Sequence, residues 1–508
     1  MVAPVTKQTG KVEVEPSRTG KVVGISIIAA LGGFLFGYDS SVINGANQAV
    51  FHQFNIINTG FQGFIVAIAL LGSALGALVG GRMANTLGRK KVMVIAAILF
   101  LIAGIGQALP FSSWDFMFWR VVGGFAIGLA AIISPMYISE VAPAHLRGRL
   151  SSLFQFAIVI GIFSTQLVNQ VLLGIAGGPT TFPESTSTYQ APVQANNDFW
   201  FGLQTWQWMF LCMVVPAVIY FLLASTLPES PRYLVARGRN EDARKVLGTI
   251  FTADVDSKLV TIESSLNAEH KPSMKDVRGR SFGLMPIVWV GIILAVFQQF
   301  VGINAVFYYS NIVFQAVGFT TADAFKQSTI ISAVNVISTL IAIALIDRLG
   351  RKPLLIIGSI GMTITLGIMS LLFVTAPKAT DLTATGAVHA GDPQLSSSSG
   401  WIAVICLNLY VVFFAATWGP IVWVLLGEMF SNTIRAMAMS LGVMSNWIAN
   451  FIVSETFPSL VSISIGLAYG IFTLCAFLSI FYVWKYVKET KGVVLEDMES
   501  LEGIERPA

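Results

Sequence analysis

The sequence predicts an all-α integral membrane protein: twelve transmembrane helices in two pseudo-symmetric lobes of six, with short cytoplasmic helices between the lobes. Three observations carry this prediction. Of the 508 residues, 55% are hydrophobic and only 11% are charged, whereas ordinary soluble domains carry about 25% charged residues. Twelve stretches approach the roughly 20 apolar residues that a helix needs to cross a bilayer. Matched motifs also recur in the same order in both halves of the chain.

Polar segments separate the predicted spans, and the longest, Glu229 to Arg280, divides the sixth span from the seventh. Apolar residues recur within it at helical spacing, so we expect short amphipathic helices there. The predicted parts are an N-terminal tail (1–21), a first lobe (22–228), a linker (229–283), a second lobe (284–487) and a C-terminal tail (488–508). The spans are predicted to begin near Val22, Phe61, Val92, Trp114, Leu150, Trp206, Leu284, Ser328, Pro353, Trp401, Ala436 and Ile463.

Lys and Arg are distributed unequally between alternate loops. If the N-terminus is cytoplasmic, the inner loops hold nearly all of these residues, and the outer loops hold only Lys326 and Lys378. Basic loops remain on the cytoplasmic side of a membrane. Both termini are therefore predicted to be cytoplasmic, and the polar segments Gly174–Thr205 and Ala376–Gly400 to be external. We expect the protein to lie in the plasma membrane.

Three features of the first half recur in the second half. The matched pairs are LGRKK at Leu87–Lys91 with LGRK at Leu349–Lys352, Glu140 and Arg147 with Glu428 and Arg435, and PESPR at Pro228–Arg232 with KETKG at Lys488–Gly492. Their common order indicates a duplicated six-helix unit. Such repeats are typical of transporters, which hold their substrate between the halves near the bilayer midplane.

Asp39 is the one acidic residue in Val22–Gln48, an uncharged run long enough to cross a bilayer. A carboxylate at that depth is unfavourable unless it faces water or a counter-charge, so it is a candidate proton carrier. Arg120 is the second deeply placed charge, and we expect it to pair with Asp39. Separation of the pair in one conformation would let Asp39 take up a proton, and approach in the other would release it. The alternative is a permanent structural salt bridge.

Amides and aromatic residues form a second polar group within the predicted spans. The seventh span supplies Gln298, Gln299, Asn304 and Tyr308, and Gly302 permits a break between them. Because an amide both donates and accepts hydrogen bonds, this set suits a ligand rich in hydroxyls, such as a sugar. The alternative is that these amides only join helices. Further candidates are Gln155 in the fifth span, Asn335 in the eighth, Trp423 in the tenth and Asn446 in the eleventh.

From about Gly20 to Asp497 the chain resembles the sugar porter family of the major facilitator superfamily, most of all the bacterial glucose– and xylose–proton symporters. The motifs that carry the resemblance are GGFLFGYD, GRMANTLGRK, WRVVGGFAIGLA, EVAPAHLRGRL, PESPRYL, QQFVGINAVFYYS, DRLGRK, WGPIVWVLLGEMF and ETKG. Two departures occur: Asn85 replaces the Asp of the general loop motif, and Lys488 replaces the Pro that usually opens the last motif.

The resemblance implies a role for each matching position. Asp39 matches the proton-linked acid, with Arg120 as its expected partner. The implied sugar-binding and cavity-lining residues are Phe36, Gln155, Gln298, Gln299, Asn304, Tyr308, Asn335, Phe414, Gly419, Trp423 and Asn446. The residues expected to form a cytoplasmic gate, closed by salt bridges in the outward-facing state, are Arg89, Glu140, Arg147, Glu229, Asp347, Arg351, Glu428 and Arg435.

The expected function is import of a hexose, most of all glucose, by proton symport through alternating access. The alternatives are an uncoupled hexose facilitator, a xylose or myo-inositol symporter and, less favoured because little chain follows the last span, a non-transporting sugar sensor. The sequence contains no phosphate-binding GxxxxGK[ST] motif and no clustered histidines. We therefore expect no enzyme activity, cofactor or metal. The expected partners are a monosaccharide, the proton and the lipid bilayer, without nucleic acid or an obligatory oligomer.

Overall fold

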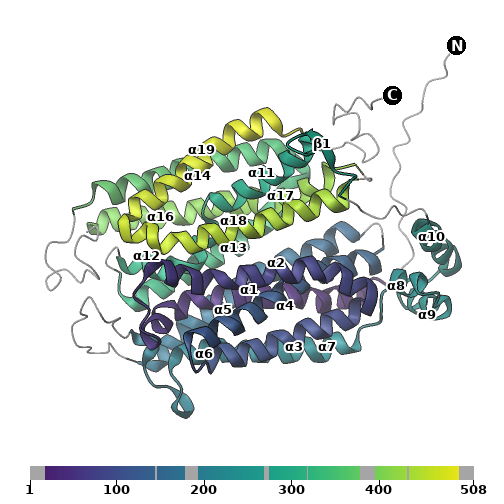
Figure 1. Cartoon of the computed structure of the whole chain (residues 1–508), viewed down its shortest axis with the longest axis horizontal. Helices are drawn as coiled ribbons and strands as arrows, with labels where there is room; N and C mark the ends of the chain where they lie inside the picture. Colours follow the sequence, from purple (N-terminus) through teal and green to yellow (C-terminus); the bar gives the residue numbers. More distant parts are fainter. Residues whose placement is uncertain are drawn as a thin grey trace.

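The structure is a computed structural model, and it is almost entirely helical. Within the described residues, twelve helical segments are long and apolar enough to cross a membrane, which confirms the twelve predicted spans. The helices of the first half of the chain run side by side in one group, and those of the second half form a group stacked on it (Figure 1). The structure describes residues 18–143, 146–177, 193–267, 274–316, 319–377, 395–431 and 434–490.

The first lobe contains the first six spans, and its sixth span is divided at Cys212 and Met213. Gly124 of the fourth helix lies against the main chain of Ala69 in the second, and Gly37 of the first lies against that of Ile158 in the fifth. A Cβ atom at either glycine would collide with a carbonyl group, so glycine permits these close helix contacts. The elements are α1 (Thr19–Gln53), α2 (Thr59–Leu87), α3 (Arg89–Ala108), α4 (Ser113–Val141), α5 (Arg147–Ala176), the short 3₁₀ turns η1 (Gln194–Asn196) and η2 (Trp200–Gly202), α6 (Thr205–Leu211) and α7 (Val214–Thr226).

The second lobe contains two interrupted spans. The seventh breaks at Gly302, as predicted; its φ is 91° and the Phe472 ring leaves no space for a Cβ atom. The tenth passes through a π-helical turn, η3 (Phe414–Trp418), which the sequence did not predict. The helices are α11 (Pro286–Phe300), α12 (Ile303–Ala316), α13 (Thr321–Leu349), α14 (Arg351–Thr375), α16 (Ser397–Phe413), α17 (Gly419–Glu428), α18 (Arg435–Ile463) and α19 (Ile465–Tyr486).

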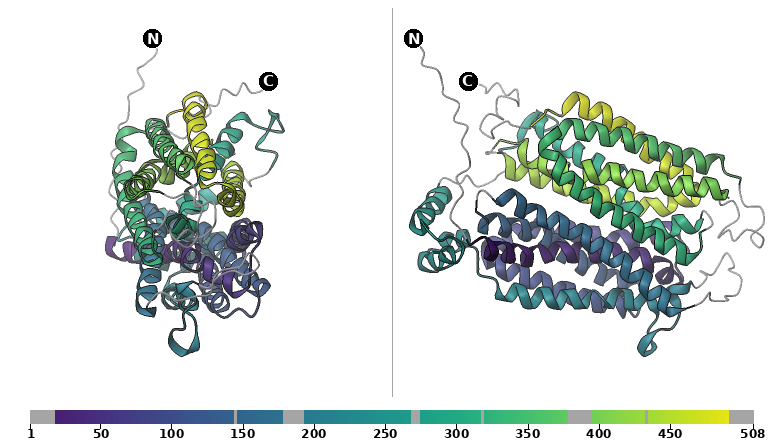
Figure 2. Two further views of the ribbon diagram at one scale, coloured as in Figure 1. Left: turned by 90° about the vertical axis from the view of Figure 1, so that its left-hand side faces the viewer. Right: turned by 180° about the vertical axis from the view of Figure 1, so that it is seen from behind.

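The linker forms three short helices, α8 (Pro231–Ala236), α9 (Asn240–Ile250) and α10 (Val255–Asn267), followed by a short strand, β1 (Arg278–Ser281). The helices share a small apolar core around Leu234 and Ala243, which confirms the predicted amphipathic character. They lie at one end of the bundle, here called the linker end, and α6 and α12 lie at the opposite or far end (Figures 1 and 2). The start of α1 is at the linker end, because the Arg18 N–H donates to the Ile250 carbonyl at 2.8 Å.

Candidate functional site

Asp39 of α1 and Arg120 of α4 meet inside the first lobe. Nη1 of Arg120 lies 4.0 Å from Oδ1 of Asp39, and both side chains are at most 2% exposed. The same Nη1 donates to the main-chain carbonyl of Asp39 at 3.2 Å, and Nη2 donates to the Val66 carbonyl of α2 at 3.2 Å. The structure thus brings the predicted pair together in a contact longer than a direct hydrogen bond.

Gln107, near the end of α3, is a third member of this site that the sequence analysis missed. Its Nε2 donates to Oδ1 of Asp39 at 3.1 Å, and its Oε1 accepts from Nη1 of Arg120 at 3.4 Å. Gln107 is a buried amide in an otherwise apolar span. The criterion that selected the amides of the seventh span would therefore also have selected Gln107.

The second cluster joins four of the predicted amides in the second lobe. Nε2 of Gln299 donates to Oδ1 of Asn446 at 3.1 Å, and Nδ2 of Asn446 donates to Oε1 of Gln298 at 2.8 Å. Nδ2 of Asn304 donates to Oε1 of Gln299 at 2.5 Å. We call Gln298, Gln299, Asn304 and Asn446 the amide cluster. Its members come from α11, α12 and α18.

The breaks in the two interrupted spans position this cluster. In the π-helical turn the main-chain hydrogen bonds no longer follow the α-helical pattern. At this turn, Nε2 of Gln298 donates to the main-chain carbonyls of Trp418 and Gly419 at 2.9 and 3.1 Å. The break at Gly302 places Gln299 and Asn304 on two separate helices within hydrogen-bonding reach of each other. π-Helical turns occur frequently at functional sites. The predicted residues Phe414 and Gly419 lie at this turn.

Three other predicted residues lie outside these hydrogen bonds. Gln155 of α5 and Trp423 of α17 are half-buried, and Asn335 of α13 is buried. Among the described residues, the structure has no hydrogen bond between the side chains of Gln155 or Asn335 and the amide cluster. Their assignment to a sugar site stays a prediction.

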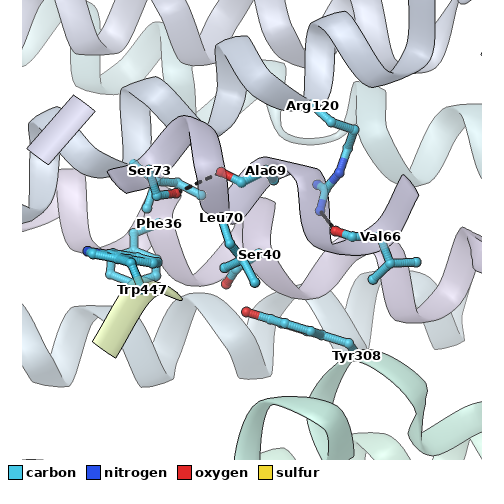
Figure 3. Close-up of a pocket in the computed structure, with 10 residues that line it drawn as sticks. Phe36, Ser40, Val66, Ala69, Leu70, Ser73, Arg120, Tyr308 and Trp447 are labelled. Atoms are coloured by element: carbon cyan, nitrogen blue, oxygen red, sulfur yellow. Dashed lines mark hydrogen bonds between the residues drawn. The ribbon is translucent and has the colours of Figure 1, made fainter. Parts of the chain in front are cut away.

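A small cavity lies where the two lobes meet (Figure 3). Phe36, Ser40 and Arg120 line it from the first lobe, and Tyr308 and Trp447 line it from the second. The rings of Phe36 and Trp447 lie 5.8 Å apart, centroid to centroid. Trp447 follows Asn446 of the amide cluster in the chain. The cavity therefore connects the buried arginine with aromatic side chains beside the amide cluster.

Uncharged hydrogen bonds join the two lobes in the half of the bundle toward the far end. Nδ2 of Asn44 donates to Oγ of Ser310 at 2.9 Å, and Nδ2 of Asn311 donates to the Asn44 carbonyl at 3.0 Å. Nδ2 of Asn47 donates to the Tyr308 carbonyl at 3.1 Å. We call these contacts between α1 and α12 the far-end clasp. The sequence analysis missed it, although Asn44 and Asn47 are amides within a predicted span.

Charged side chains form a different cluster at the linker end of the first lobe. Nε and Nη2 of Arg89 donate to the two carboxylate oxygens of Glu140 at 2.9 and 2.8 Å. Oγ of Ser230 donates to Oε2 of Glu140 at 2.5 Å. Oε1 of Glu229 accepts from the main-chain N–H groups of Arg89 and Lys90, at the start of α3. This carboxylate thus supplies acceptors to a helix N-terminus.

The second lobe repeats this cluster. Arg351 donates to both oxygens of Glu428 at 3.0 and 2.7 Å, and Oγ1 of Thr490 donates to Glu428 at 2.6 Å. Glu489 accepts from the main-chain N–H groups of Arg351 and Lys352 at the start of α14. The sequence analysis missed Ser230, Glu489 and Thr490. The matched PES and KET motifs contained the signal for them.

These ion pairs connect helices of the same lobe, not helices of opposite lobes. Of the other predicted gate residues, Arg435 donates to the Phe430 carbonyl at 3.0 and 3.2 Å. The side chains of Arg147 and Asp347 lie outside the described part of the structure. The gate role of the whole set stays a prediction.

Two six-helix lobes, with a buried acid–arginine pair in the first, an amide cluster in the second and a small cavity between them, define the class of membrane carriers built from repeats. Residues 25–501 match the family described as "Sugar (and other) transporter", and the protein belongs to this family as a multi-pass membrane protein. It is 48% identical over 478 residues to a glucose transport protein of Synechocystis sp., covering 94% of this chain and 97% of the relative. It is 35% identical over 513 residues to a D-xylose-proton symporter of Escherichia coli, covering 94% and 95%.

A solved structure agrees with this assignment. The inward-open conformation of the xylose transporter XylE from E. coli superposes with a TM-score of 0.74 at 33% identity, covering 94% of this chain and 99% of that one. The resemblance predicted from the motifs is therefore confirmed at the level of family and fold.

Proposed function

We propose that this protein imports a hexose, with glucose as the first choice, by proton symport through alternating access in the plasma membrane. The observation that carries the proposal is the cavity between the lobes. One wall is the guanidinium of the Asp39–Arg120 pair, and the other holds Tyr308 and Trp447 beside the amide cluster. A movement of Arg120 can therefore reach Tyr308 and Trp447, the chain neighbours of the amide cluster, through the side chains around this small cavity. The similarity to a glucose transport protein and to a D-xylose-proton symporter supports both parts of the proposal.

The amide cluster supplies the chemistry for sugar recognition. The four side chains now bond mainly to one another and to main-chain carbonyls. A hexose hydroxyl can replace one of these bonds with another of similar strength, because a hydroxyl donates and accepts like an amide. The net free energy of each exchange is therefore small, and binding stays reversible, as transport requires. The rings of Phe36 and Trp447 offer apolar surface to the C–H face of a sugar.

Proton coupling rests on the length of the Asp39–Arg120 contact. At 4.0 Å the guanidinium attracts the carboxylate without a direct hydrogen bond between the side chains. Protonation of Asp39 removes this attraction, which frees Arg120 to move relative to the cavity that it lines. Sugar binding on the other side of the cavity would favour one of the two positions. The proton and the sugar then shift the same equilibrium between two conformations. This shared equilibrium is what couples the movement of one to the movement of the other.

The distribution of Lys and Arg supports cytoplasmic termini and a cytoplasmic linker end. The far end is then extracellular. The far-end clasp closes the outer side in this conformation, so we propose that the structure represents a state that cannot exchange sugar with the outside. The ion-pair clusters at the linker end would act as the proposed cytoplasmic gate when the lobes close there.

The deciding experiment is sugar counterflow in proteoliposomes with a panel of labelled sugars, repeated under an imposed pH gradient. We expect glucose to exchange in counterflow and an inward proton gradient to drive its accumulation. Asp39→Asn should abolish accumulation and retain counterflow. Asp323→Asn, which removes an exposed acid that accepts from Lys326, serves as the control and should retain both.

Three other outcomes would change the proposal. Accumulation unchanged in Asp39→Asn would reject the role of this acid. Wild-type counterflow without any response to the pH gradient would identify an uncoupled facilitator. Preference for xylose or myo-inositol over glucose would replace the substrate and leave the mechanism in place.

A further inference from the structure

We infer that Gln107 is a positioning residue for proton exchange at Asp39, because its amide bridges the acid and Arg120 and holds them apart. The inference rests on the proposed proton coupling and adds a residue to it. Gln107 hydrogen-bonds to both members of the pair, and it uses a different side-chain atom for each.

The amide of Gln107 donates a hydrogen bond through its nitrogen and accepts one through its oxygen. Its N–H group donates to Oδ1 of the acid at 3.1 Å, and its oxygen accepts from the guanidinium at 3.4 Å. Few side chains can do both, and an amide can because it carries a donor and an acceptor. A direct charge-assisted hydrogen bond between acid and arginine would be about 2.8 Å long. The observed 4.0 Å is longer, which agrees with an amide inserted beside the contact.

Packing around the amide leaves one carboxylate oxygen of Asp39 for the proton. Gly123 of α4 faces both groups, and a Cβ atom there would lie 2.8 Å from Nε2 of Gln107 and 2.9 Å from Oδ2 of Asp39. Glycine therefore provides the space in which the bridge fits. Among the described residues, Oδ2 of Asp39 has no hydrogen-bond partner. With Oδ1 held by Gln107, we assign the exchangeable proton to Oδ2.

The other titratable groups around the pair come from three places. Tyr38 precedes Asp39 on α1, and Cys212 lies near Tyr38 from the break between α6 and α7. From α12, Tyr308 and Tyr309 lie within electrostatic range of Arg120. α2 contributes the Val66 carbonyl and α3 the amide of Gln107. A phenol and a thiol are normally neutral near pH 7. Among these groups, Arg120 is therefore the charge that faces Asp39, and Gln107 is the uncharged side chain that donates a hydrogen bond to it.

The bridge has a consequence for the pH at which sugar uptake responds. A hydrogen bond donated to a carboxylate favours its ionised form. Gln107→Met removes the donor and keeps a side chain of similar length between the two charges. We expect the pH of half-maximal gradient-driven uptake to rise by about one unit. Gln107→Glu keeps the shape and places a second carboxyl opposite the first, so it should raise the same midpoint at least as far.

The experiment measures glucose uptake against external pH in proteoliposomes, together with counterflow at equal pH on both sides. Asn169→Leu is the matched control. It removes another fully buried amide of the first lobe, whose Nδ2 donates to the Val42 carbonyl. We expect the control to leave the midpoint within the error of the wild type. A purely structural role would lower uptake equally at all pH values.

Failure of the inference and failure of the proposed function give different results. If the wild type responds to pH and both Gln107 variants keep its midpoint, or move it downward, the positioning role is wrong and coupling stands. If the wild type itself shows no pH response, the proposed coupling falls and this inference falls with it. Where Gln107→Met fails to fold, Gln107→Glu tests the same position, and an unchanged midpoint in this variant would overturn the inference.

Discussion

The two ends of the bundle are held by different chemistry. At the linker end, each lobe has an arginine–glutamate pair, Arg89 with Glu140 and Arg351 with Glu428, and each pair connects helices of one lobe. At the far end, uncharged amides and hydroxyls such as Asn44 and Ser310 connect the two lobes. The charged clusters are duplicated by the internal repeat. The far-end clasp has no such duplicate among the contacts described above.

The difference shows which contacts can change when the lobes move. A neutral hydrogen bond contributes about 0.5–1.5 kcal/mol net, so the far-end clasp can open at small cost. Removing one partner of a buried ion pair costs roughly 3–5 kcal/mol. A lobe that moves as one body needs strong internal contacts, whereas the boundary between two lobes needs weak ones. In the contacts named here, the charged pairs therefore lie inside each lobe and the neutral hydrogen bonds of the far-end clasp lie between the lobes.

The largest expected effect follows from breaking the buried ion pair of the first lobe. Arg89→Leu leaves Glu140, whose side chain is 9% exposed, without its counter-charge. We expect a loss of about 3 kcal/mol in stability, measured as a lower thermal midpoint in detergent without sugar. Arg239→Leu is the control, because Arg239 and Asp242 form an exposed pair and should lose almost nothing. Equal losses in both variants would contradict the comparison.

A smaller loss is expected from the matching change in the second lobe. Glu428 is 29% exposed, so water can solvate it after Arg351→Leu. We expect about half of the loss found for Arg89→Leu, since the penalty for an unpaired charge falls with its access to water. The measurement is the same thermal midpoint, recorded in parallel. Should the second lobe lose more than the first, burial would not be what sets the strength of these pairs.

Opening the far-end clasp should have a smaller effect on stability but a directed effect on conformation. Asn44→Leu removes bonds to Ser310 and Asn311, and we expect the balance to shift toward outer-open states by about 1 kcal/mol. Distances between spin labels at Ile57→Cys and Lys326→Cys, in a background without the native cysteines, report this shift. Asn408→Leu is the control, because Asn408 donates to Val404 of its own helix. An unchanged distance distribution in Asn44→Leu would show that the clasp does not hold the lobes together.

Sequence analysis identified the residues that are unfavourable inside a membrane unless they have a partner or a function. Asp39 and Arg120 are charges in apolar runs, and Gly302 stands between two amide-bearing turns, so pattern alone selects them. It missed Gln107, Asn44 and Asn311 although each is an amide within a predicted span, because the partners of an amide depend on how its helix is rotated. It missed Glu489 although the matched PES and KET motifs align it with Glu229, because only the first of these two glutamates was assigned to the gate. Side-chain chemistry and the family resemblance both selected the four residues of the amide cluster, and the structure supplied the hydrogen bonds between them.

The smallest expected effect concerns Asp242 of α9, at the linker end but outside the membrane. Hydrogen bonds and charge attraction from Arg239 lower the pKa of Asp242 below its usual value. A lowered pKa in the folded state contributes stability above the unfolded pKa, and this contribution is lost as the pH falls through the folded pKa. Because the side chain is well exposed, water and salt screen the interaction.

We therefore expect the thermal midpoint of Asp242→Asn to follow that of the wild type from pH 7 down to about pH 3, which is below the usual Asp pKa of about 3.9. The measurement is a series of thermal scans in detergent across this range. A wild-type midpoint that falls with acid more steeply than that of Asp242→Asn would assign part of the stability to this exposed pair. Such a result would mean that surface charge stabilises α8–α10 in addition to the apolar core around Leu234 and Ala243. The contribution of a contact to stability would then depend on whether it is charged or neutral, and not on whether it is buried or exposed.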